Sequence, residues 1–144
     1  MIVSKILETK PDMGVISVTP DSAVGEAAKV LSAKGIGTVV VSSDGTALDG
    51  ILSERDIVRA LGKEGAGCLT GPVSGLMTKT IKTCAPSDQA DDVLTTMTQG
   101  RFRHMPVLSE GKMIGLISIG DVVKARLAEL AMEKDALEGM IMGH

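Results

Sequence analysis

The chain has 144 residues, a formal net charge of −3, 44% hydrophobic residues and 23% charged residues, which predicts a packed domain and excludes a disordered chain. It contains one Phe and no Tyr or Trp, and its Lys and Arg residues are scattered, which argues against a nucleic-acid partner. No apolar run approaches the roughly 18 residues of a membrane span. We therefore expect a soluble, cytoplasmic protein without a membrane partner.

The first half of the chain predicts the order β-α-β-β-α. Pro20 stops the first extended segment, and Asp21 or Ser22 is the expected N-cap of the helix that follows. The predicted elements are, in order, a strand at 15–18, a helix that ends near Gly35, a strand at 38–41, a turn at 43–45, a returning strand that ends at Ser53, and a helix from Ser53 to about Leu61.

The second half of the chain repeats this order after a Gly-containing stretch at 62–72, which is typical of a linker. The predicted elements are, in order, a strand at 80–83, a helix capped by Ser87 or Asp88 that ends near Gly100, a strand at 105–108, a turn at 110–112, a returning strand that ends at Ser118, and a helix from about Asp121 toward Met140. The apolar stripe of this last, longer helix fits either packing on its own core or a dimer contact.

A seven-residue motif occurs twice, as GILSERD and, 65 residues later, as GLISIGD. The flanking segments also match, because 16–45 aligns with 81–111, and VSKIL at 3–7 is similar to VSGLM at 73–77. The chain is therefore expected to consist of two copies of one unit, arranged as a pseudo-symmetric pair.

The Ser-x-x-Asp pattern inside each motif has two interpretations. A Ser N-cap with an acidic residue three positions later forms a capping box, which stabilises the start of a helix. A helix N-terminus that follows a strand also binds phosphate, with the Ser hydroxyl donating to a phosphate oxygen. The Asp carboxylate can then accept hydrogen bonds from ribose hydroxyls. Because both roles can coexist, the repeated motif indicates a nucleotide site.

These residues resemble tandem CBS domains, which pair into a Bateman module. The resemblance is carried by the motifs at 50–56 and 115–121 and by the Met-Pro-Val strand at 105–107, and it spans roughly residues 8–133. It implies an α/β fold of the α+β type with two pseudo-symmetric β-α-β-β-α repeats. The implied domains are listed here: CBS domain 1 at 8–66, CBS domain 2 at 73–133, and a C-terminal helix extension or tail at 134–144.

The resemblance further implies two clefts for adenosine ligands, with AMP as the first expectation and ATP, ADP, NAD or S-adenosylmethionine as alternatives. In such clefts adenine lies against the first short strand, ribose on the Asp, and phosphate on the Ser and on basic residues before the second strand. The residues implied for the first cleft are Ile16, Val18, Gly37, Thr38, Val39, Ser53, Arg55 and Asp56. Those implied for the second cleft are Thr80, Ile81, Thr83, Arg103, His104, Met105, Pro106, Ser118 and Asp121.

The two clefts are predicted to differ in their affinity for phosphate. The first copy has Gly37 and Thr38 where the second has Arg103 and His104, and Arg55 compensates only in part. Because charge-assisted hydrogen bonds contribute about 1.5–3 kcal/mol each, we expect the second cleft to bind a phosphorylated ligand more tightly.

Catalytic constellations and metal-binding motifs are not evident in the sequence, and Cys84 is expected to be a small apolar lining residue. We therefore expect a stand-alone, non-catalytic sensor without a metal, which forms a homodimer and acts on a separate regulated protein. A structural interaction module, in which the Ser-x-x-Asp motifs only cap helices, is the alternative from a different functional class.

Overall fold

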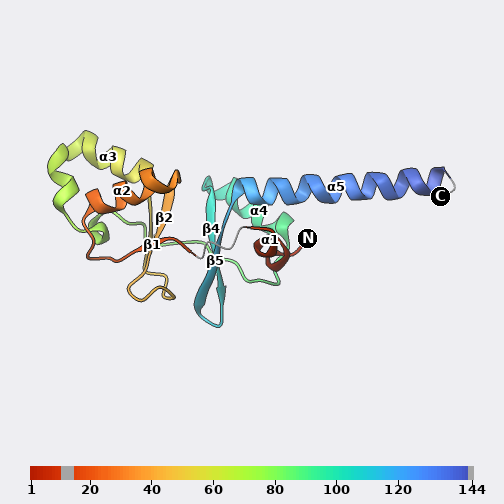
Figure 1. Cartoon of the computed structure of the whole chain (residues 1–144), viewed down its shortest axis with the longest axis horizontal. Coiled ribbons are helices and arrows are strands. Elements are labelled where there is room, and N and C mark those ends of the chain that lie inside the picture. Colours follow the sequence, from red (N-terminus) through yellow and green to blue (C-terminus); the bar gives the residue numbers. More distant parts are fainter. Residues whose placement is uncertain (11–14, 143–144) are drawn as a thin grey trace. The chain divides into compact units, whose positions relative to one another are not determined.

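A computed structural model describes residues 1–10 and 15–142, and its order of helices and strands confirms the predicted mixed fold of two repeats (Figure 1). The contacts divide the chain into two units. The first-repeat unit is built from residues 15–82 and 109–114, and the second-repeat unit from residues 1–10, 83–108 and 115–142. Each unit has its own hydrophobic core, so each is described by itself.

The first-repeat unit contains a three-stranded sheet in the order β1-β2-β3. The pairing of β1 with β2 is parallel and that of β2 with β3 is antiparallel. All four residues of β2 are buried, which explains its continuous β-branched sequence. The elements are β1 (Ser17–Val18), α2 (Val24–Lys34), β2 (Thr38–Val41), β3 (Gly50–Ser53), α3 (Glu54–Glu64) and the 3-10 helices η1 (Ala66–Thr70) and η2 (Val73–Gly75).

The second-repeat unit holds most of a two-stranded sheet, β4-β5, whose connecting residues 109–114 group with the first-repeat unit. The strand predicted at 80–83 is wrong, because this region makes only an isolated parallel bridge between Cys84 and Val107. The predicted turn at 110–112 is confirmed, with both Glu110 and Gly111 at positive φ. The elements are α1 (Val3–Thr9), α4 (Ala90–Gly100), β4 (His104–Ser109), β5 (Lys112–Ser118) and α5 (Ile119–Ile141).

The predicted N-caps of α2 and α4 are wrong, and the structure gives the physical reason. Ala23 and Gln89 occupy the cap positions without a side-chain cap. Ser22 instead accepts a hydrogen bond from the Thr19 amide at 3.2 Å, and Asp88 accepts one from the Ala85 amide at 2.8 Å. These side chains close the turns that precede the helices, so they are not available to cap them.

The first backbone amide of each of these helices is satisfied by a distant carbonyl. The Val24 amide donates to the Gly71 carbonyl at 2.9 Å, and the Ala90 amide donates to the Met1 carbonyl at 2.9 Å. A long-range backbone contact thus replaces the local side-chain cap that the sequence pattern predicts.

Two further local predictions are corrected. The stretch at 62–72 is not an open linker, because α3 continues to Glu64 and η1 buries Cys68. Gly100 is the last residue of α4, and Arg101 takes the left-handed conformation at φ 58°. A Cβ on Gly100 would collide with the Phe102 ring, which explains why a glycine occupies the last position of α4. Gly35 does end α2, at φ 64°, as predicted.

Each repeat is preceded in the sequence by a leading segment, VSKIL at 3–7 or VSGLM at 73–77, and the two leading segments are exchanged between the units. The VSKIL segment packs in the second-repeat unit, where the Val3 amide donates to the Asp88 carbonyl at 2.9 Å. The VSGLM segment packs in the first-repeat unit, where the Val73 amide donates to the Ser22 carbonyl at 2.8 Å. Both valine side chains are fully buried. Each core is therefore completed by residues that precede the other repeat in the sequence.

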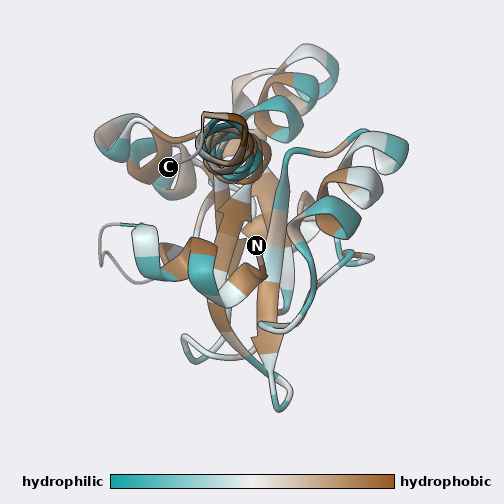
Figure 2. Cartoon of the chain, turned by 90° about the vertical axis from the view of Figure 1, so that its right-hand side faces the viewer, coloured by the Kyte–Doolittle hydropathy of each residue, from teal (hydrophilic) through white to brown (hydrophobic). Residues whose placement is uncertain are grey.

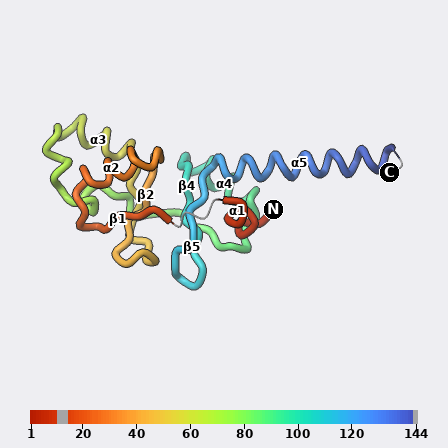
Figure 3. Tube along the Cα trace, in the orientation of Figure 1, coloured from red at the N-terminus to blue at the C-terminus, as the bar shows by residue number. Residues whose placement is uncertain are grey.

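Apolar residues are concentrated on the strands (Figure 2). Helix α5 runs well beyond α1 and α4 of its own unit (Figure 3). Its end at Ile141 agrees with the predicted extent, and tail residues 143 and 144 lie outside the described residues. In the described part of the chain, none of the helices combines the length and apolarity that crossing a membrane requires.

Candidate functional site

Both Ser-x-x-Asp motifs form complete capping boxes. The Ser53 hydroxyl accepts from the Asp56 amide at 3.2 Å, and the Asp56 carboxylate accepts from the Ser53 amide at 2.9 Å. The corresponding distances for Ser118 and Asp121 are 3.1 and 2.8 Å. The capping interpretation is thus confirmed in both repeats. All four residues stay partly exposed, so these side chains can also reach a ligand.

The start of each motif helix is tied to the residue that precedes the neighbouring strand. The Ile119 amide donates to the Arg103 carbonyl at 2.8 Å, and the Glu54 amide donates to the Gly37 carbonyl at 2.9 Å. This contact brings Arg103 and His104 next to the Ser118 box. The equivalent contact brings Gly37 next to the Ser53 box. The predicted alignment of the two repeats is therefore matched by an identical backbone contact in each.

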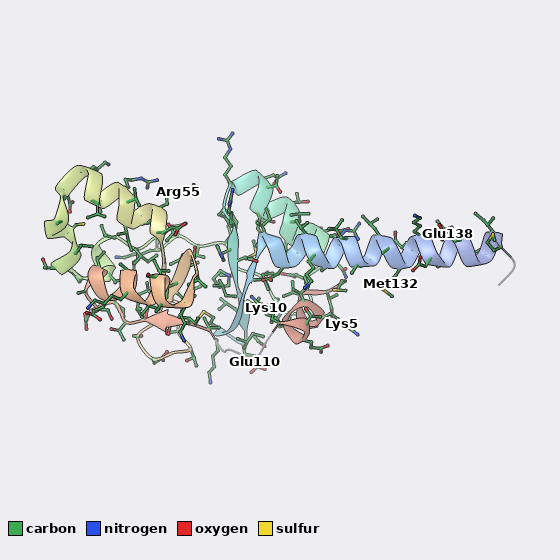
Figure 4. All side chains as sticks on the ribbon, turned by 45° about the horizontal axis from the view of Figure 1, so that its top comes forward. Lys5, Lys10, Arg55, Glu110, Met132 and Glu138 are labelled. Carbon is green, nitrogen blue, oxygen red and sulfur yellow. The ribbon has the colours of Figure 1, made fainter. Side chains whose placement is uncertain are left out.

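A basic residue that the sequence reasoning missed, Lys10, lies in the second-repeat unit beside β5 (Figure 4). Its Nζ donates to the Asp121 carboxylate at 2.9 Å and to the Leu116 carbonyl at 2.7 Å. The signal that could have found it is the match of VSKIL with VSGLM, continued to Lys10 and Thr80. The exchange of the leading segments then puts Lys10, and not Thr80, beside the second motif.

The charges around this site shift two pKa values. Burial alone would raise the pKa of Asp121, but hydrogen bonds from the Ser118 amide and from Lys10 lower it below its usual value. Burial lowers the pKa of His104, the positive charges of Lys10 and Arg103 lower it further, and Asp121 opposes them. The site thus combines a carboxylate that is paired with Lys10 and a nearby imidazole, which suits a ligand with both hydroxyl and anionic parts.

The site in the first-repeat unit lacks these basic groups. Thr80, Gly37 and Thr38 stand at the positions of Lys10, Arg103 and His104. Arg55 is exposed on α3 (Figure 4), and it is the basic residue predicted for this site. The two capping boxes are alike in geometry but differ in the charge around them.

The remaining predicted residues divide by burial and by unit. Val39 and Met105 belong to the hydrophobic cores and Pro106 is buried, so their side chains do not face solvent. Ile16 and Val18 are half-buried beside β2, and their carbonyls accept from the Val40 and Ser42 amides. Thr80 and Ile81 belong to the first-repeat unit, and the exposed Thr83 belongs to the second-repeat unit.

Among the residues that the structure describes, the other reactive groups give no second site. Cys84 is 7% exposed in the core of the second-repeat unit, where burial and the nearby Asp88 charge raise the pKa of its thiol to about 11. A thiol with this pKa is a poor nucleophile near neutral pH. Across residues 1–10 and 15–142, three or more His, Cys, Asp or Glu side chains do not gather in a metal-binding cluster.

The CBS domain family matches this chain at residues 3–63 and 73–128. An uncharacterized 17.7 kDa protein of Acidianus ambivalens is 36% identical over 87% of this chain and 73% of that protein. A CBS domain-containing protein of Arabidopsis thaliana is also 36% identical over 87% of this chain, which spans 63% of that longer protein.

Solved structures of the same family have the same fold. The CBS-domain containing protein of Agrobacterium tumefaciens matches with a TM-score of 0.82 and 44% identity, over 88% of this chain and 99% of that chain. The structure of CBSX2 in complex with AMP matches with a TM-score of 0.74 and 26% identity, over 88% of this chain and 96% of that chain.

Proposed function

The chain belongs to the CBS-domain family, and from this premise we propose that it is a regulatory module that binds an adenosine nucleotide, AMP before others. The observation that carries the proposal is the ion pair between Lys10 and Asp121 in the second capping box, with Arg103 and His104 at the start of the strand whose preceding carbonyl accepts from the first amide of α5. The match to a CBS structure that holds AMP supports the ligand class. ATP, ADP, NAD and S-adenosylmethionine share the adenosine part and are the alternatives to be tested.

In this proposal the ribose binds one partner of the Asp121–Lys10 ion pair and the phosphate binds the other. The Asp121 carboxylate accepts hydrogen bonds from the ribose hydroxyls, and it must release Lys10 to do so. The Lys10 ammonium then turns to the phosphate, where it joins Arg103, His104 and the N-terminus of α5. The ion pair that exists without ligand is thus exchanged for two charge-assisted contacts to the nucleotide.

The second-repeat site is proposed to bind a phosphorylated ligand more tightly than the first. Lys10 is paired with Asp121 of its capping box, and Arg103 and His104 lie at the start of the adjoining strand, whereas the first-repeat site has Arg55 on an exposed helix surface. At about 1.5–3 kcal/mol for each charge-assisted hydrogen bond, the loss of two such contacts exceeds a tenfold difference in affinity.

Regulation follows if the ligand binds one arrangement of the protein better than another, because only this difference in affinity can shift the equilibrium between them. Helix α5 starts at the proposed site and carries an exposed surface far from it. We propose that it communicates the ligand state to a separate regulated protein or to a second protomer.

Calorimetry with AMP on the Asp121→Ala and Asp56→Ala variants tests the proposal. Each variant loses the same type of capping box, which costs about 1 kcal/mol of stability in both, and Asp121→Ala also loses the ion pair with Lys10. We expect Asp121→Ala to lower AMP affinity at least about tenfold and Asp56→Ala to leave the tighter site intact. Equal losses in the two variants would refute the asymmetry.

The capping geometry itself favours a second candidate, a structural module without a ligand. Both boxes are fully closed by protein hydrogen bonds. A thermal-shift panel of AMP, ADP, ATP, NAD and S-adenosylmethionine separates the two candidates. A ligand at 100 times its dissociation constant stabilises a protein by about 2.7 kcal/mol, and the absence of any shift across the panel would favour the structural module.

A further inference from the structure

Arg101 holds a backbone conformation that residues other than glycine rarely adopt. It caps the 11-residue helix α4 at its C-terminal end, with φ 58° and ψ 40°. The equivalent residue of the first repeat, which caps the 11-residue helix α2, is Gly35, with φ 64° and ψ 36°. In this left-handed region a Cβ crowds the following carbonyl oxygen, so glycine is the less strained residue at both positions. The second repeat therefore keeps an arginine where a glycine would relieve strain.

The contacts within the protein do not explain the Arg101 side chain. It is exposed, and its guanidinium takes part in none of the ion pairs among residues 1–10 and 15–142. A positive charge at a helix C-terminus does stabilise the helix dipole, but Lys34 supplies one to α2 from a regular helical position. Backbone strain without such a structural benefit is typical of residues that contact a ligand.

Arg101 lies close to the proposed second-repeat site. Phe102 packs against the core of this unit, and the arginines on either side of it, Arg101 and Arg103, are both exposed. The Arg103 carbonyl accepts from the Ile119 amide at 2.8 Å, which joins the connection between α4 and β4 to the start of α5 (Figure 1). Two residues of extended chain span at most about 7 Å. The backbone of Arg101 is therefore within this distance of the residue that contacts the N-terminus of α5.

From this strain and this position we propose that Arg101 is a specificity-determining residue that binds the second and third phosphates of a nucleoside di- or triphosphate. The inference rests on the proposed nucleotide site at Ser118 and Asp121. Arg103 and the N-terminus of α5 serve the phosphate next to the sugar, and the Arg101 guanidinium donates paired hydrogen bonds to the phosphates beyond it. AMP has no such phosphates, so Arg101 raises the affinity for ADP and ATP relative to that for AMP.

Calorimetry with ADP and AMP on the Arg101→Gly variant of the full chain tests this role. We expect the affinity for ADP to fall at least about fivefold and the affinity for AMP to change by less than about twofold. The urea midpoint should not fall, because glycine adopts the left-handed conformation without strain. A lower affinity for ADP in a protein that is no less stable is not the result that a structural role of Arg101 would give.

Three further variants separate the charge of Arg101 from other effects. Arg101→Lys keeps a positive charge at the same place and should retain most of the preference for ADP. Glu110→Gly changes the other non-glycine residue with positive φ in the described part of the chain, which lies in a hairpin turn. Lys134→Gln removes an exposed positive charge about 20 Å along α5 from Asp121. The last two should leave the ratio of ADP to AMP affinity unchanged.

The outcomes that would contradict this inference differ from those that would contradict the nucleotide site. If Arg101→Gly binds AMP and ADP with the wild-type ratio of affinities, Arg101 does not contact the additional phosphates. The inference also fails if Lys134→Gln changes this ratio as much as Arg101→Gly, since the effect would then reflect net charge alone. A wild-type chain that binds neither AMP nor ADP would refute the proposed function itself, and with it the role of Arg101.

Discussion

At the scale of single residues, Lys10 has two roles at the proposed site that an experiment can separate. Its ion pair with Asp121 is about one-third exposed on the lysine side, so the pair contributes at most about 1 kcal/mol to folding. Its larger effect is expected on binding, because it supplies a positive charge for the phosphate while it competes for the carboxylate that the ribose needs.

We predict that Lys10→Met weakens AMP binding by about tenfold but does not weaken adenosine binding, since adenosine lacks the phosphate and gains an unoccupied Asp121. Calorimetry with the two ligands on the same variant measures the difference directly. Arg55→Met in the other unit is the matched control and should leave the tighter AMP site unchanged. Equal weakening of AMP and adenosine would show that Lys10 acts only by holding the local structure.

His104 predicts how stability depends on pH. Burial and the charges of Lys10 and Arg103 hold the pKa of His104 below its ordinary value of 6.5, so the unfolded chain takes up this proton more readily than the folded chain. The contribution to stability is full above about pH 6.5 and is lost as the pH falls toward the lower folded pKa.

Urea unfolding at about pH 7.5 and pH 5.5 should therefore show a smaller loss of stability in His104→Gln than in the wild-type chain. The lowered pKa of Asp121 places its titration below this window in both proteins. Identical losses in both proteins would contradict the assignment of this pH dependence to His104.

At the scale of the elements, the motif glycines are explained by the exchanged leading segments. A Cβ on Gly50 would lie 2.6 Å from Met77 Sδ and 2.8 Å from Met77 Cγ. A Cβ on Gly115 would lie 2.7 Å from Leu7 Cδ2. Met77 and Leu7 are the equivalent last residues of VSGLM and VSKIL, so each glycine makes room for the segment that closes its own unit.

We predict that Gly50→Ala destabilises the protein by about 1–3 kcal/mol, since Met77 must shift along most of its side chain. Gly62→Ala is the matched control. It lies inside α3 with nothing within 4 Å of the added Cβ, and it should stabilise by about 0.5–1 kcal/mol. Chemical denaturation measures both, and a stabilising Gly50→Ala would contradict the proposed close approach of Met77.

The elements that the sequence predicts well are those with a local cause. The capping boxes, the left-handed Gly35 and the turn at 110–112 depend on residues a few positions apart, and all three are confirmed. The N-caps of α2 and α4 are missed because backbone carbonyls from distant segments replace a local side chain. Lys10 is missed for the same reason, since its partner Asp121 is 111 residues away.

At the scale of the whole molecule, the exchange of segments means that a repeat cut out along the sequence does not contain its own core. The first repeat needs Val73, which is fully buried in its core. It also needs the Gly71 carbonyl, which accepts a hydrogen bond from the Val24 amide at the start of α2. It also needs Thr78, whose backbone pairs with Ile51 of β3. Small domains bury only about 60% of their unfolded surface, so the loss of these contacts is decisive.

Two fragments of nearly equal length test this dependence. Fragment 15–82 keeps the segment that closes the first-repeat core, whereas fragment 1–66 replaces it with α1, whose buried Val3 belongs to the other core. We expect fragment 15–82 to melt cooperatively by circular dichroism and fragment 1–66 to be largely unfolded. Val73→Asp in fragment 15–82 should abolish its transition, because it buries an unpaired charge. A fragment 1–66 that melts as cooperatively as fragment 15–82 would show that the repeat folds without the exchanged segment.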